Sequence, residues 1–175
     1  MSLQIRPATP ADLPAITAIY AHAVLFGTAT FELVPPDVAE MTQRFETLIA
    51  GGFPYLAATI DGTVVGYAYA GPYRARPAYR FAVENSIYLD LKAQGKRVGT
   101  QLMQALLAES ETRGYRLMVA VIGDSANLAS IGVHIRSGFQ MVGTVQNVGL
   151  KFGRGLDTVL MQRPLGEGAG TIPKS

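Results

Sequence analysis

The 175-residue sequence contains no cysteine, no tryptophan and only two histidines. Without cysteine the chain can form no disulfide, no thiolate metal site and no cysteine nucleophile. The two histidines, His22 and His134, do not stand in a ligand-like cluster, so we expect no metal. Because the chain has no disulfides to form, it suits a reducing compartment, and we expect a cytoplasmic protein.

Charge of one sign and long apolar runs are also scarce. Fifteen basic and 13 acidic residues leave a formal net charge of +2, too small for the strongly basic face of a nucleic-acid-binding protein. No segment approaches the roughly 20 apolar residues of a membrane span. The first residues lack the basic stretch and apolar run of an export signal. We therefore expect neither nucleic acid nor membrane as a partner.

The sequence does contain enough apolar material for a hydrophobic core. Apolar residues make up 49% of the chain, which at this length suits one ordinary domain. The last ten residues are rich in glycine and include Pro173. We expect a single domain over residues 1–165 and a flexible tail over residues 166–175.

Hydrophobic periodicity and turn residues predict an alternation of strands and helices. Asp61-Gly62 is a strong hairpin signal between two β-rich runs. Strands are expected at 3–7, 55–60, 63–70, 81–89, 117–122, 139–146 and 156–162, and helices at 10–26, 37–50, 98–113 and 126–136. This order predicts an α/β fold with a mixed sheet, helices on both faces and the unit 81–122 at its centre.

Residues 88–100 lead from the end of an expected strand through a polar loop into an amphipathic helix. A helix N-terminus exposes unpaired N–H groups and a positive dipole end, and Gly95 and Gly99 allow a pyrophosphate to approach. Lys96 and Arg97 add positive charge. The segment has neither the P-loop nor the G-x-G-x-x-G pattern, which disfavours nucleoside triphosphates and dinucleotides. An ordinary basic loop is the alternative.

The stretch from Gln94 to Thr100 resembles the Q/R-x-x-G-x-G/A turn of the GNAT acetyltransferases, which binds the coenzyme A pyrophosphate. Gln94 and Gly99 match this pattern, whereas Arg97 stands where the family usually has its first glycine. If this position requires a positive φ, arginine carries a strain cost of about 1–2 kcal/mol.

A wider similarity covers nearly residues 3–163. Five stretches, in the family's order, resemble the phosphinothricin and methionine sulfoximine acetyltransferases: 66–72, 83–88, 119–122, 127–130 and 151–154. The resemblance implies the GNAT fold, a mixed, mostly antiparallel sheet with one splayed parallel pair, a homodimer, and acetyl-coenzyme A as co-substrate. It implies cofactor contacts from Ile87, Tyr88, Leu89, Gln94, Gly95, Lys96, Arg97, Val98, Gly99, Thr100, Asn127 and Ser130.

Glu84 is the expected general base. An N-acetyltransferase must take a proton from an amine, and a carboxylate within reach is the usual acceptor of that proton. Glu84 lies inside a central strand, where a charge is costly unless it is used or paired. A solvated or salt-bridged strand residue is the alternative. His134 stands where many family members have a tyrosine that protonates the leaving thiolate, but a lone histidine on a helix is more often structural. Asn127 could be only a helix cap.

The loop 72–81 interleaves three arginines with three aromatic residues. The guanidinium groups of Arg74, Arg76 and Arg80 suit carboxylates and phosphinates, and the rings could close over a small substrate. A solvated loop and an RNA-binding patch are the alternatives. By resemblance, Thr30 and Phe31 also contact the acceptor.

The predicted function is transfer of acetyl from acetyl-coenzyme A to the amine of a small amino acid or analogue, such as methionine sulfoximine, methionine sulfone or phosphinothricin. Two rival functions stay open. One is acetylation of a protein or peptide, which needs an open groove for the peptide. The other is a coenzyme A-binding sensor without catalysis, for which the departure at Arg97 is the best support.

Overall fold

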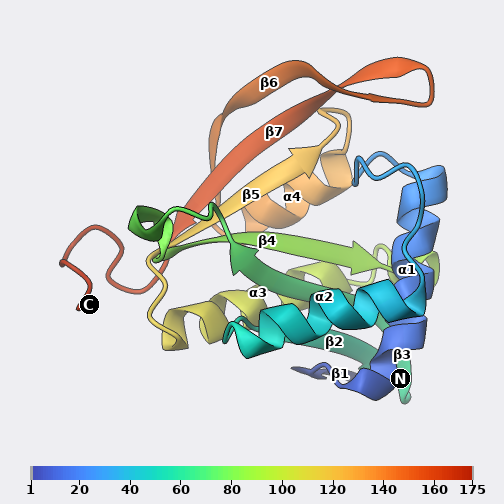
Figure 1. The fold of residues 1–175 in the computed structure, drawn as a ribbon, viewed down its shortest axis with the longest axis horizontal. Coiled ribbons are helices and arrows are strands. Elements are labelled where there is room, and N and C mark those ends of the chain that lie inside the picture. Colours follow the sequence, from blue (N-terminus) through green and yellow to red (C-terminus); the bar gives the residue numbers. More distant parts are fainter. Residues whose placement is uncertain (1, 175) are drawn as a thin grey trace.

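The computed structural model describes residues 2–174 and contains a seven-stranded mixed sheet (Figure 1). Along the sheet the strands follow the order β1-β2-β3-β4-β5-β7-β6, and only β4 and β5 run parallel. The predicted fold class and its central strand–helix–strand unit are thereby confirmed. The strands are β1 Leu3–Pro7, β2 Tyr55–Ile60, β3 Thr63–Pro72, β4 Ala82–Leu89, β5 Leu117–Gly123, β6 Gln140–Lys151 and β7 Arg154–Pro164.

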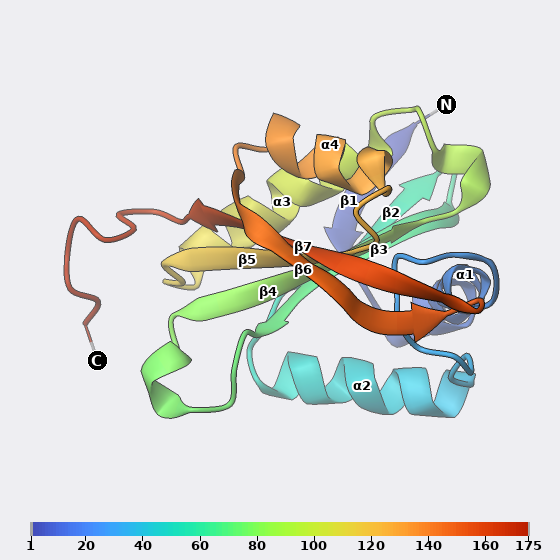
Figure 2. The same cartoon turned by 90° about the horizontal axis from the view of Figure 1, so that it is seen from above.

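Four α-helices cover the two faces of the sheet, with α1 and α2 on one side and α3 and α4 on the other (Figure 2). They are α1 Leu13–Phe26, α2 Val38–Ala50, α3 Val98–Thr112 and α4 Leu128–Arg136. Each face has its own core. The α3 side buries mainly aliphatic and methionine side chains, whereas the α1 side includes a group of stacked tyrosines. None of the helices within residues 2–174 has the length and apolar character to cross a membrane.

Local signals set most element boundaries. Asp61 and Gly62 both have positive φ, as a tight hairpin turn between β2 and β3 requires. Asp37 caps α2 by accepting a hydrogen bond from the Glu40 N–H at 2.8 Å. The first helix begins later than predicted, because Pro10–Asp12 forms a 3₁₀ turn ahead of α1.

The ranges predicted for the last two strands, 139–146 and 156–162, were too short. Asn147 and Gly149 look like the end of a strand, but the structure continues β6 to Lys151 through an irregularity in its pairing with β7. Asn147 takes a φ of 51°, and its N–H donates to Asp157 Oδ1 at 2.9 Å. The bulge therefore absorbs the turn-like residues without ending the strand. The hairpin turns at Phe152 and Gly153, both with positive φ.

The parallel pair β4–β5 separates partway along its length. Only Ala82, Val83 and Glu84 pair with β5, opposite Leu117 to Val119, although β4 continues to Leu89 and β5 to Gly123. The backbone of residues 85–89 on the β5 side is thereby left without a neighbouring strand, which matches the predicted splay. This gap in the sheet determines where the functional site forms.

Candidate active site

A cavity of about 890 Å³ runs along the separated edge of β4 to the start of α3. Its wall includes Ile87 to Leu89 from β4, the turn before α3, and Asn127 and Ser130 at the start of α4. A strand edge with free backbone groups at one end and a helix N-terminus at the other suits an elongated ligand that ends in phosphates.

Two residues of the turn before α3 have left-handed backbone conformations. Gly95 has a φ of 74° and Arg97, the N-cap residue of α3, has a φ of 61°. The first hydrogen bond in this helix runs from the Gln101 N–H to the Arg97 carbonyl. The N–H groups of Val98, Gly99 and Thr100 therefore point out of the helix end, and all three residues line the cavity.

A side chain closes the gap between β4 and β5 just beyond their last backbone pair. Asn85 is 6% exposed, and its Nδ2 donates to the Val119 carbonyl at 3.3 Å. Its Oδ1 lies 3.0 Å from Nε2 of His134 on α4. Asn85 thus substitutes for the next ladder hydrogen bond and ties the separated strands to the helix above them.

His134 is 2% exposed, and both of its ring nitrogens have protein partners. Nδ1 donates to the Ser130 carbonyl at 2.8 Å, while Nε2 faces Asn85. Burial lowers the pKa of this imidazole below its ordinary value. His134 lines the cavity beside Glu84, but its ring can reach a ligand only if one of these two contacts opens.

Glu84 is the last β4 residue paired with β5, so its carboxylate lies where the sheet begins to open. It lines two cavities, one of about 270 Å³ between the separated strands and one of about 540 Å³ between α2 and the sheet. The residue opposite Glu84 on β3 is Gly71, where an added Cβ would lie 3.2 Å from Cδ2 of Leu48. Burial raises the pKa of Glu84, and the positive charge of Arg74 partly opposes this.

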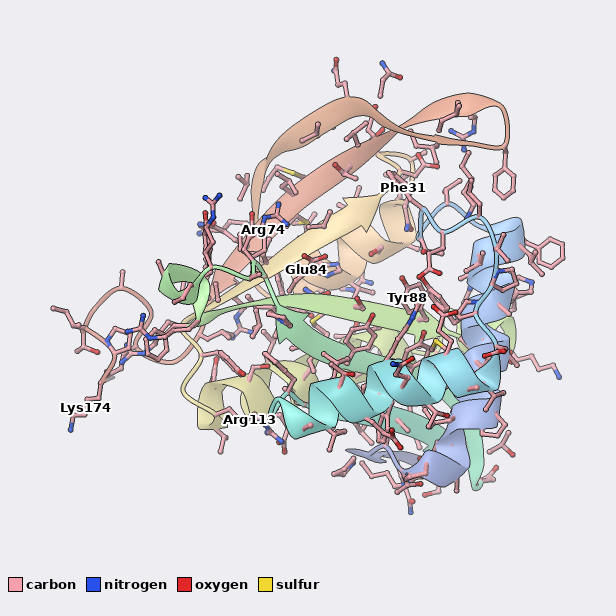
Figure 3. All side chains as sticks on the ribbon, viewed as in Figure 1. Phe31, Arg74, Glu84, Tyr88, Arg113 and Lys174 are labelled. Carbon is pink, nitrogen blue, oxygen red and sulfur yellow. The ribbon has the colours of Figure 1, made fainter. Side chains whose placement is uncertain are left out.

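The cavity of about 270 Å³ adjoins the cavity of about 890 Å³ that runs along β4. Both include Ala29, Ile87, Tyr88, Asn127 and Ser130 in their walls. In Figure 3, Glu84 and Tyr88 lie along β4, with Tyr88 nearer to α1, and Arg74 lies in the 73–80 loop beside the other end of the strand. A ligand that follows the strand edge from the α3 turn would therefore end beside the half-buried carboxylate of Glu84.

Comparison with known proteins agrees with this arrangement. The acetyltransferase (GNAT) family model matches residues 18–139. The chain belongs to the GNAT family of acetyltransferases.

The acetyltransferase is 51% identical over 170 residues to the phosphinothricin N-acetyltransferase of Alcaligenes faecalis, an alignment that covers 97% of this chain and 86% of the relative. It is 44% identical to the L-methionine sulfoximine/L-methionine sulfone acetyltransferase of Pseudomonas aeruginosa, over 93% and 94% of the two chains. A GNAT phosphinothricin acetyltransferase from Sinorhizobium meliloti, crystallised with acetyl-coenzyme A, superposes with a TM-score of 0.97 at 47% identity, covering 100% and 95%. The chain is an acetyl-coenzyme A-dependent N-acetyltransferase.

The structure of this acetyltransferase brings most of the predicted cofactor residues to one cavity. Lys96 is the exception, because it is exposed in the turn and does not line the cavity. The predicted residues in its wall are Ile87, Tyr88, Leu89, Gln94, Gly95, Arg97, Val98, Gly99, Thr100, Asn127 and Ser130. Asn127 also caps α4, since its Oδ1 accepts from the Ser130 N–H at 3.2 Å.

The predicted acceptor contacts of the acetyltransferase divide into two groups. Thr30 and Phe31 line the cavity that holds Glu84 and His134. The three arginines lie in the exposed loop beyond β3 and line none of the three cavities described above. Arg74 packs over the Tyr73 ring and Arg80 over the Phe81 ring. Of the three, only Arg74 affects the pKa of Glu84.

Sequence reasoning missed several residues of the site. Asn85 is a polar residue on the buried side of a central strand, a signal that could have identified it. Ser86 and Tyr69 face each other across β4 and β3 and line the cavity beneath α2, together with Arg44. Arg44 lies on α2, for which the sequence predicted a helix but no part in the site, so nothing local pointed to it.

Proposed function

We propose that the enzyme acetylates the primary amine of a small amino acid or analogue of the methionine sulfoximine, methionine sulfone or phosphinothricin type, with Glu84 as general base. The position of Glu84 carries the proposal: its half-buried carboxylate lies at the opening of the sheet, in the wall of a cavity that adjoins the larger cavity along β4. The names of the relatives support the acceptor class.

Acetyl-coenzyme A would bind with its diphosphate on the N–H groups at the start of α3 and its thioester near Glu84. An amine in solution carries a proton at neutral pH and cannot attack while it does. Glu84 takes this proton, directly or through one water molecule. The amine nitrogen then bonds to the thioester carbon and the carbon–sulfur bond breaks. The nitrogen loses its second proton to give a neutral amide, and coenzyme A leaves as a thiolate that takes up one proton, so the ammonium's two protons end on Glu84 and on the thiol.

Two further groups assist the reaction. A backbone N–H on the free edge of residues 87–89 stabilises the oxyanion that forms on the thioester carbonyl. His134 is the proposed proton donor to the thiolate, and in this role its Nε2 exchanges Asn85 for the sulfur. Burial lowers the pKa of this imidazole, so the protons that it gives to the sulfur depend on its protonated fraction.

For the acceptor we propose a position against Thr30, Phe31 and Glu84, with its anionic group toward the arginine loop. The positive charge of Arg74 already favours the ionised form of Glu84. Arg76 and Arg80, on the same exposed loop, are assigned to the same anion. An amino acid would thus present its amine to a carboxylate and its acid group to guanidinium groups.

The test is a thiol-release assay with acetyl-coenzyme A and a panel of acceptors: methionine sulfone, methionine sulfoximine, phosphinothricin, ordinary amino acids and lysine-containing peptides. We expect thiol release with the small amino acid analogues and little release with peptides. Release with peptides alone would favour the protein acetyltransferase. Release that never depends on an acceptor would favour the coenzyme A sensor.

We propose in addition that the enzyme is a cytoplasmic homodimer that associates through β6. This strand lies at the edge of the sheet, and of its twelve residues only the last, Lys151, is charged. Its exposed apolar side chains include Met141, Val142, Val145, Val148 and Leu150. A long edge strand without charge protection favours association with another strand, and a two-fold symmetric pairing of two copies would cover it.

A further inference from the structure

The end of β6 contacts the loop between α1 and α2 through a buried lysine. Lys151 is 4% exposed, and its Nζ donates to the Thr30 carbonyl at 2.9 Å. Within the described part of the chain no carboxylate lies within 4.0 Å of this ammonium group. A buried cation is costly unless it is compensated. The Phe152 ring, with its centroid 5.2 Å from Nζ, and the Thr30 carbonyl provide this compensation, so the ammonium group is tied to the loop that carries Thr30 and Phe31.

The Phe31 ring lies against two glycines on different strands. A Cβ added at Gly149 of β6 would lie 2.4 Å from the Phe31 ring, and one at Gly123 of β5 would lie 3.1 Å from it. Neither position could therefore hold a larger residue without moving the ring. The position of the Phe31 ring therefore depends on the position of the end of β6. Lys151 links that end of β6 to Thr30, the residue before Phe31.

Other contacts hold the remainder of this loop. The Thr30 hydroxyl shares a hydrogen bond with the Tyr20 hydroxyl at 2.9 Å, and Tyr20 donates to Glu32 at 2.8 Å. Further along, Arg44 donates to Glu32 at 2.6 Å. These contacts hold the Thr30 and Glu32 side chains, whereas Lys151 holds the backbone carbonyl that immediately precedes Phe31.

We propose that Lys151 is a positioning residue for acceptor recognition, which fixes Phe31 as one wall of the acceptor cavity through the Thr30 carbonyl. The inference rests on the proposed function, since it needs an amine acceptor to bind beside Glu84 in this cavity. Gly149 contributes by leaving room for the ring. The larger cavity, assigned to acetyl-coenzyme A, is lined mainly by α1, β4, the turn before α3 and the starts of α3 and α4, and of this loop it includes only residues 27–29. We therefore expect Lys151 to affect acceptor affinity more than acetyl-coenzyme A affinity.

The first test compares Lys151→Met with Lys174→Met, which removes the same charge from an exposed lysine in the tail. We expect Lys151→Met to raise the acceptor KM by about 10-fold, because a displaced wall misplaces the substrate, while the KM for acetyl-coenzyme A changes less than about two-fold. Lys151→Arg, which keeps a charged donor, should recover part of the loss. An unchanged acceptor KM, or an equal rise in both KM values, would overturn the proposal.

A double-mutant cycle with Phe31→Ala tests whether Lys151 acts on the acceptor through Phe31. Once Phe31 is removed, Lys151→Met should cost little further acceptor affinity, since the two changes act on one wall. Effects that multiply would show that Lys151 acts in another way and would overturn the proposal.

Hydrogen exchange of the segment 28–34 gives a readout that needs no acceptor. Faster exchange in Lys151→Met than in Lys174→Met is expected, because the loop loses its attachment to β6. Unchanged exchange would contradict the positioning role. If the wild-type enzyme acetylates no small amine, the proposed function fails, whereas an active wild type with an unaffected acceptor KM in Lys151→Met rejects the role of Lys151 alone.

Discussion

Glu84 is a half-buried carboxyl group. Burial favours its protonated form, whereas catalysis as a base requires its ionised form. Burial raises the pKa of the carboxyl group above its ordinary value, which brings it closer to the pH at which a base is useful. A general base acts only when it is deprotonated. We therefore predict that kcat/KM for the acceptor falls as pH drops through this raised pKa.

Glu84→Gln should reduce kcat at pH 7 by about 10²-fold or more, because the glutamine amide cannot accept the amine proton. The KM for acetyl-coenzyme A should change little. Steady-state kinetics between pH 5 and 9 would measure both effects, with the acidic limb of the wild-type profile absent from the variant. Wild-type turnover in the variant would remove Glu84 from the mechanism.

The same substitution has a predictable effect on stability. A carboxyl group whose pKa is higher in the folded protein than in the unfolded chain binds its proton more tightly when folded, so its ionised form destabilises the fold. Glu84→Gln should therefore unfold at a higher temperature than the wild type at pH 7. This difference should disappear below the pKa of an unfolded glutamate, about 4.3.

Arg97 departs from the family pattern, which has a glycine at this position, and its backbone conformation carries a strain cost. The sequence predicted strain if this position had a positive φ, and the structure gives a φ of 61°. Arg97→Gly should stabilise the apoprotein by about 1 kcal/mol, since a left-handed non-glycine residue costs about 1–2 kcal/mol and glycine returns part of this gain as chain entropy. For a chain of this size that corresponds to about 2–4 °C in Tm.

Gly95→Ala is the matched control for Arg97→Gly, because Gly95 has a φ of 74° and an added Cβ would meet no atom within 4 Å. It should lose stability through the backbone alone. Calorimetry on the two variants should give shifts of opposite sign. Shifts of the same sign would mean that the conformation of the turn does not determine them.

Residue roles that depend on distant partners could not be read from the sequence. Asn85 reaches Val119 and His134, which are 34 and 49 residues away, and Lys151 reaches Thr30 across 121 residues. The composition of each segment indicates that a polar side chain is present but not which strand or loop it will meet. The Gln94–Thr100 turn could be predicted, because all its parts are consecutive in the chain.

At the scale of elements, the start of helix α4 predicts two separable tasks for Asn127. Its side-chain oxygen caps the helix at the Ser130 N–H, and its position in the cofactor cavity leaves its amide nitrogen available to the coenzyme A arm. Aspartate caps helices as well as asparagine does but has no amide donor. Asn127→Asp should therefore keep the Tm and raise the KM for acetyl-coenzyme A several-fold.

Asn127→Ala should raise the same KM and also lose about 1 kcal/mol of stability, since it removes the cap as well. Thermal unfolding and kinetics on both variants separate the two tasks. If Asn127→Asp binds acetyl-coenzyme A as the wild type does, Asn127 is only a cap.

The element boundaries show which signals act locally. The β2–β3 hairpin and α2 follow from residues at their own ends, Asp61-Gly62 and Asp37, and both were predicted. The end of β6 does not, because Asn147 and Gly149 carry turn-like signals that pairing with β7 overrides through a bulge. Strand length there depends on the neighbouring strand, which no local pattern contains.

At the scale of the whole molecule, the exposed edge of β6 leads to the last prediction. A second copy that pairs with this edge would cover the apolar side chains of Val145 and Val148, which are 44% and 55% exposed. Replacing both with lysine places like charges against each other in a symmetric interface and protects the edge from pairing. The double variant should sediment as a monomer of 18.7 kDa at concentrations where the wild type has twice that mass.

Ile172→Lys, a change at a 92% exposed residue outside the sheet, is the control and should leave the wild-type mass unchanged. A wild type that stays monomeric at every concentration, or a double variant that still dimerises, would show that β6 is not the interface.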